Sequence, residues 1–129
     1  MRLSAIAALL PAVLIFASLS ETASARLMTR AEFMPICAKQ VHGPTPAQTE
    51  AACNCSYDRA LMWVPLADVR DIIHEGYRQN GGLAVKTAEV PEARRGTVIA
   101  AIKGVQDMIL VCMGLALNDK LHPDGTERK

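Results

Sequence analysis

The residues of this chain with the greatest chemical potential are its four cysteines, Cys37, Cys53, Cys55 and Cys112. Two sulfurs as close in sequence as Cys53 and Cys55 can bind a soft metal such as Cu(I), or can cycle between dithiol and disulfide. An even number of cysteines in a short exported chain instead predicts a framework of structural disulfides. We favour disulfides, because redox and zinc sites typically show Cys-x-x-Cys motifs, which this sequence lacks.

Four cysteines allow three pairings. A bridge between Cys53 and Cys55 would close a very tight ring with unsuitable geometry, so Cys37 should pair with one of them and Cys112 with the other. The pairing of Cys37 with Cys53 and Cys55 with Cys112, and the pairing of Cys37 with Cys55 and Cys53 with Cys112, both remain open. A helix through Asn54 would place Cys53 and Cys55 about 200° apart and could be stapled to two neighbours. Disulfides that close loops of roughly 16 and 60 residues would each stabilise the folded state by about 3 to 4 kcal/mol in the chain-entropy model.

Copper or zinc at Cys53 and Cys55 is the alternative to a disulfide framework without a cofactor. The residues that could join a copper site are Met28, Met34, His42, Met62, Met108 and Met113. Met62, Met108 and Met113 fall in predicted helices, where methionine commonly fills gaps in a core. We therefore expect no cofactor, with Cu or Zn as the alternative.

The first 25 residues have the features of a cleavable signal peptide. Arg2 precedes an apolar run over residues 5–19, and Ala23-Ser24-Ala25 offers small residues at the cleavage positions. The mature chain would begin at Arg26 and would be periplasmic or secreted. With no cysteine before Cys37, a lipoprotein anchor has no attachment point, and we expect no membrane span after signal cleavage.

Composition narrows the class of protein and partner. The chain has 129 residues, a formal net charge of +1, 50% hydrophobic residues and 4% aromatic residues. Such balanced charge does not favour nucleic acid, whose binding requires clustered basic side chains. A chain of this size buries only a modest core, so we expect one domain with covalent reinforcement.

The pattern of apolar residues predicts an all-α fold, a small bundle of four helices stapled by two disulfides. Thr29 and Glu32 fit a capping box, and Thr45 with Pro46 marks a second helix start. We expect Pro35 to kink the first helix or to delay its start, and we expect the first two helices to form an antiparallel hairpin. The predicted helices cover residues 30–42, 46–63, 66–79 and 91–117. The domain would span residues 26–117, with residues 118–129 as a disordered polar tail.

The remaining polar residues form no catalytic constellation. The three histidines, His42, His74 and His122, are far apart in sequence and are expected at the surface. Nucleophile elbows, phosphate-binding glycine loops and zinc-hydrolase motifs are missing from the sequence, so we expect no enzyme activity. Tyr57 and Trp63, near the end of the second predicted helix, could anchor a protein partner, or Trp63 could close the core.

The order of signal peptide, Cys37, Cys53-x-Cys55 and then Tyr57-Asp58-Arg59-Ala60-Leu61 resembles small exported bacterial proteins with a Cys…Cys-x-Cys pattern and no assigned function. The resemblance covers about 30 residues. The short basic start of the signal peptide and its Ala23-Ser24-Ala25 cleavage residues are typical of bacteria, so together they imply a periplasmic location. The sequence thus predicts a non-enzymatic accessory or binding protein. Its partner would be another envelope or secreted protein. The chain would act as an inhibitor of that protein or as a subunit of an envelope assembly.

Overall fold

The structure is a computed structural model that describes residues 27–41 and 43–129. The predicted signal peptide lies outside the described residues. The elements are α1 (Arg30–Gln40), α2 (Pro46–Ser56), the π-helical turn η1 (Tyr57–Leu61), α3 (Ala67–Asn80), the 3₁₀ turn η2 (Thr87–Glu89) and α4 (Glu92–Leu117). The all-α bundle stapled by two disulfides is therefore confirmed.

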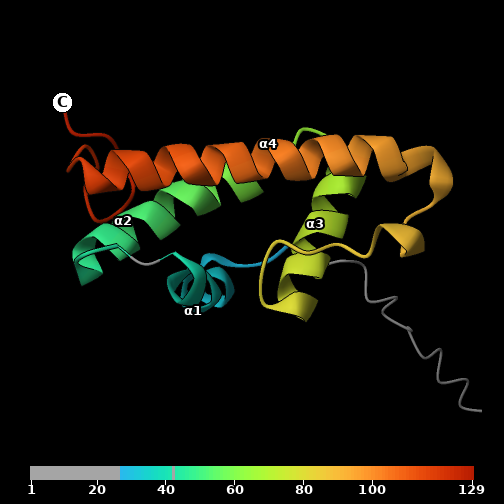
Figure 1. Ribbon diagram of the computed structural model, residues 1–129, viewed down its shortest axis with the longest axis horizontal. Coiled ribbons are helices and arrows are strands. Elements are labelled where there is room, and N and C mark those ends of the chain that lie inside the picture. The colour runs from blue at the N-terminus through green and yellow to red at the C-terminus, as the bar shows by residue number, and fades with distance from the viewer. Residues whose placement is uncertain (1–26, 42) are drawn as a thin grey trace, which may run out of the picture.

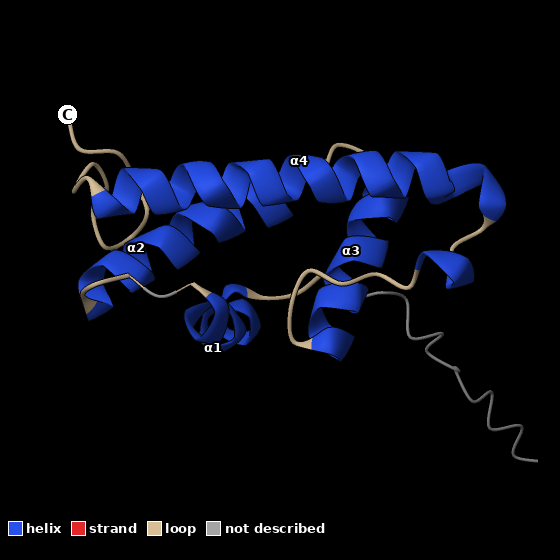
Figure 2. Ribbon diagram, in the orientation of Figure 1, coloured by secondary structure: helices blue, strands red, loops and turns tan. Residues whose placement is uncertain are grey.

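Helix α4 forms one long layer, and α1, α2 and α3 pack along one side of it (Figure 1, Figure 2). Its inward face buries Val98, Val105, Cys112 and Ala116. Helix α1 is seen nearly end-on, whereas α2 lies in the plane of the view (Figure 1). The expected antiparallel hairpin is therefore wrong: α1 crosses α2 steeply, because Phe33 also packs on α3, with its ring 5.2 Å from that of Tyr77.

The predicted helix starts are confirmed by two complete capping boxes. The Thr29 side chain accepts from the Glu32 backbone N–H, and Thr45 does the same with Gln48. Helix α1 begins at Arg30 and includes Pro35, so the alternative start near Met34 is wrong. Helix α3 ends at Gly81, whose φ of 65° is readily adopted only by residues without a Cβ.

The second predicted helix, 46–63, is not one regular α-helix. It is α-helical to Ser56 and then widens into η1, where the Met62 N–H donates to the Tyr57 carbonyl, 3.0 Å away. A π turn holds one residue more than an α turn, so the side chains after it change direction. Ala60 and Leu61 are buried beyond this turn, whereas Trp63 is exposed.

The C-terminal segment 118–129 is folded, which corrects the expected disorder. Leu121 is buried and forms a bridge with Glu127, and the Asn54 side-chain amide donates to the Pro123 carbonyl. Gly125 has a φ of 87° and lies so close to α2 that a Cβ would approach the Cys55 nitrogen to 2.5 Å. The contacts of Asn54 with Pro123 and of Gly125 with Cys55 join residues about 70 apart, and local composition could not reveal them.

Helix α4 bears on the expectation of no membrane span after signal cleavage, which stays a prediction. It has 26 residues and a window of mean hydropathy 1.8, which makes it long and apolar enough to cross a membrane by length and composition; 17% of that window is buried. Those two criteria do not separate a span from a helix of a folded domain. A disulfide from Cys112 to Cys55 ties α4 to α2.

Candidate functional site

The four cysteines form two buried disulfides, Cys37–Cys53 and Cys55–Cys112. Each is at most 1% exposed. Helical spacing directs Cys53 toward α1 and Cys55 toward α4, so α2 is bonded to a neighbour on each side. The structure thus selects one of the two pairings that the sequence left open.

This arrangement bears directly on the metal and redox alternatives. Within residues 27–41 and 43–129, no group of three or more His, Cys, Asp or Glu side chains could hold a metal ion. Cys53 and Cys55 are bonded to different helices, so their use as thiolates would require both disulfides to be reduced first. Copper or zinc at this pair stays a prediction for the reduced protein.

Tyr57, one of the two predicted partner-binding residues, is held largely within the fold. Its hydroxyl donates to the Met28 carbonyl at 2.8 Å, and its ring lies 5.6 Å from that of Phe33. The Arg30 guanidinium covers the ring at 4.7 Å. Burial raises the pKa of the Tyr57 hydroxyl, opposed by the positive charge of Arg30. These contacts assign Tyr57 a packing role at the joint between α1 and α2.

Trp63, the other predicted partner-binding residue, is 76% exposed. Trp63 lies in the turn after η1. Pro65, two residues later, lacks the backbone N–H that a further helical turn would need, so the helix does not continue past the indole. A cleft of about 260 Å³ opens beside Trp63, between this turn and α4. Its lining residues are Arg59, Ala60, Trp63, Val64, Pro65, Ala101, Gly104, Val105 and Met108.

The Trp63 cleft is mainly apolar, and Arg59 is the one charged residue among the described side chains that line it. Gly104 leaves the α4 side open, since a Cβ at that position would meet no atom within 4 Å. The Arg59 guanidinium lies 3.2 Å from the Glu127 carboxylate, which orients it at the rim. An exposed indole beside an apolar cleft has the anatomy of a protein-binding anchor. Sequence reasoning found Trp63 but missed the contribution of α4.

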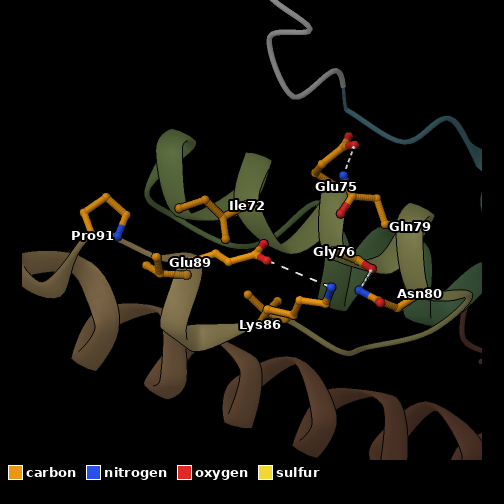
Figure 3. A pocket seen from close by; sticks show the side chains of 10 residues that line it. Ile72, Glu75, Gly76, Gln79, Asn80, Lys86, Glu89 and Pro91 are labelled. Atoms are coloured by element: carbon orange, nitrogen blue, oxygen red, sulfur yellow. Dashed lines mark hydrogen bonds and ion pairs between the residues drawn. The ribbon is translucent and has the colours of Figure 1, made fainter.

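A second cavity, of about 250 Å³, lies between α3 and the connector that leads to α4 (Figure 3). It is lined by Ile72, Glu75, Gly76, Gln79, Asn80, Val85, Lys86, Glu89, Val90 and Pro91. Its polar groups already have partners: Glu75 accepts from Gln79, Asn80 donates to two backbone carbonyls, and Lys86 faces Glu89 at 4.0 Å. The cavity therefore offers a ligand few uncommitted polar groups.

His74, which was expected at the surface, is fully buried. The Met28 N–H donates to its Nδ1, and its Nε2 contacts the Leu61 carbonyl, both at 2.9 Å. Only a neutral ring with its proton on Nε2 satisfies both partners. Burial lowers the pKa of His74, opposed by its hydrogen bond to Leu61. His74 is thus a structural residue that joins the start of the described chain to the end of η1.

Comparisons of the chain with protein-family models, with curated proteins and with solved structures find no match.

Proposed function

We propose that the chain is an exported, periplasmic accessory or binding protein without enzyme activity, which acts as an inhibitor or as a subunit of an envelope assembly. The observation that carries this proposal is the exposed Trp63 at the edge of an apolar cleft, on a scaffold held by two disulfides. The Trp63 side chain is 76% exposed, although tryptophan is highly buried on average. Aromatic residues beside pockets supply much of the binding energy in protein interfaces.

The proposed partner is an envelope or secreted protein that places an apolar side chain in the Trp63 cleft. The indole would cover that side chain, and Arg59, which is paired with Glu127, would lie at the rim. Because the disulfides fix α2 relative to α4, the cleft would be largely formed before the partner arrives. Pre-formed sites lose less conformational entropy on binding.

The periplasmic location is supported by the disulfides, which persist in oxidising compartments. The resemblance to small exported bacterial proteins with a Cys…Cys-x-Cys pattern points to the same compartment. When a bacterial host expresses the chain from Met1, we expect the protein in its periplasmic fraction to begin at Arg26. Intact mass measured before and after reduction with alkylation tests this, with four alkyl groups added only after reduction. Retention of residues 1–25, or thiols that react before reduction, would contradict the proposal.

We expect Trp63→Ala to weaken partner binding by about 2 kcal/mol, roughly 30-fold, because the substitution removes the indole that would cover the bound side chain. The protein from the periplasmic fraction would be used to capture partners from an envelope extract. The captured protein would then be purified, and its affinity for each variant measured by titration calorimetry.

Leu117→Ala is the matched control, since Leu117 is an apolar side chain that is 49% exposed and does not line the cleft. It should leave the affinity unchanged. Equal affinity of the Trp63→Ala and unsubstituted proteins would refute the assignment of the cleft. Turnover that depends on one particular side chain would refute the non-enzymatic role.

A further inference from the structure

The outward face of α4 carries large apolar side chains that the domain does not cover. Ile99 is 55% exposed, Leu110 62% and Val111 50%. The other helices lie along the opposite side of α4 (Figure 1). Between the apolar groups lies one charged pair, with the Lys103 Nζ 2.9 Å from the Asp107 carboxylate and both side chains well exposed.

Two glycines open this face further. A Cβ at Gly96 or Gly114 would meet no atom within 4 Å, so packing inside the domain does not require either glycine. Each lowers helix stability by about 1 kcal/mol relative to alanine. Another backbone could approach α4 closely at these two positions.

The outward residues are arranged symmetrically about Val105. At 100° per residue, Gly96 and Gly114 share one direction, because eighteen residues make five turns. Ile99 and Val111 lie six residues on either side of the centre, and Ala100 and Leu110 lie five residues on either side. Lys103 and Asp107 lie two residues on either side of the centre.

We propose that this face of α4 binds the α4 helix of a second copy of the chain, antiparallel, about a two-fold axis that crosses the helix at the level of Val105, on the side opposite that buried side chain. Lys103 of each copy then faces Asp107 of the other, Ile99 packs against Val111, and Ala100 against Leu110. Gly96 meets Gly114 at both ends, which lets the helices approach closely. Parallel pairing would instead place Lys103 opposite Lys103 and Asp107 opposite Asp107, so charge complementarity selects the antiparallel arrangement.

The size of the face sets the expected strength of the dimer. A helix of 26 residues is about 39 Å long. One helix face buries less than the roughly 800 Å² per partner of a standard stable interface. We therefore expect a reversible dimer with a dissociation constant on the order of micromolar. It uses a different surface from the Trp63 cleft and does not depend on the function proposed there.

Sedimentation equilibrium of the protein from the periplasmic fraction, over a wide concentration range, tests the dimer. Lys103→Glu alone and Asp107→Lys alone each place like charges across the axis, and each should raise the dissociation constant about tenfold or more. The double variant K103E/D107K exchanges the two charges and should restore the original value. Leu110→Arg should abolish the dimer without unfolding the domain, because Leu110 is exposed. Lys86→Glu, on the connector that precedes α4 and beside the α3 cavity, is the control and should change nothing.

A monomer at every concentration would overturn the proposal. So would a dimer that is insensitive to both single charge reversals, or one that the double variant fails to restore. Binding of the monomer to phosphatidylcholine vesicles, with loss of that binding in Leu110→Arg, would overturn it in favour of a membrane surface.

Discussion

Replacing Cys55 and Cys112 together by serine is expected to lower the free energy of unfolding by about 4 kcal/mol. This bridge closes a loop with a sequence separation of 57 residues, and loss of a long loop closure returns the most entropy to the unfolded chain. It also joins α2 to α4, the two helices with the most extensive mutual contact. Urea unfolding followed by circular dichroism measures the change, and a domain of this size could lose most of its stability.

The second bridge supplies the matched comparison. Cys37 and Cys53 are separated by 16 residues, so their joint replacement by serine should cost about 3 kcal/mol. Removal of the shorter loop should therefore be the milder change. A larger loss from the Cys37 and Cys53 pair would contradict the loop-closure argument. A peptide linking Cys37 to Cys55 in a non-reducing digest would contradict the pairing itself.

Much of this fold could be predicted from local sequence signals. Thr29 and Thr45 supply caps whose hydrogen bonds reach only three residues ahead, and Gly81 supplies the left-handed residue that ends α3. Such interactions depend on neighbours in sequence and need no knowledge of the tertiary structure. The spacing of Cys53 and Cys55 likewise predicted that α2 would be bonded on two sides, although not which partner each cysteine takes.

The features that sequence could not predict depend on distant contacts. The folded tail depends on Asn54, which holds the Pro123 carbonyl, and on a close approach at Gly125. The steep crossing of α1 depends on its packing against Tyr77 in α3. A polar segment and a short helix connection each allow several outcomes, and only partners far along the chain decide between them.

The candidate site likewise combines features that local sequence predicts with features that depend on distant contacts. Trp63 stood out in the sequence as the only tryptophan, and its exposure follows from the turn that Pro65 enforces. The cleft beside it is also lined by Gly104 on α4, which in the sequence is recognisable only as a residue that weakens a helix. The missed signal at His74 was its position beside Ile73 in the apolar stripe of α3, where both residues are buried.

His74→Ala is expected to lower the free energy of unfolding by about 4 kcal/mol. The substitution leaves a cavity. It also leaves the buried Met28 N–H and the buried Leu61 carbonyl without a hydrogen-bond partner. His74→Gln, whose amide can both donate and accept, should recover part of this loss. Urea unfolding at neutral pH compares the two. A loss below about 1 kcal/mol in the alanine variant would mean that water or a rearranged backbone replaces the imidazole.

The same geometry makes stability depend on pH. Burial lowers the pKa of His74 in the folded protein below its ordinary value near 6.5, with Arg70 and Arg78 acting in the same direction and Asp71 and the Leu61 carbonyl opposing. The unfolded chain therefore binds the proton first as pH falls. The stability that His74 contributes is complete above pH 6.5 and is lost as the pH falls from there through the lower pKa of the folded protein.

Protonated Nδ1 of His74 can no longer accept the Met28 N–H, so the N-terminal end of the described domain should loosen first. His74→Gln should flatten the pH dependence in this window, whereas His122→Gln, at an exposed position, should preserve it. An unchanged slope in His74→Gln would assign the pH response to another group.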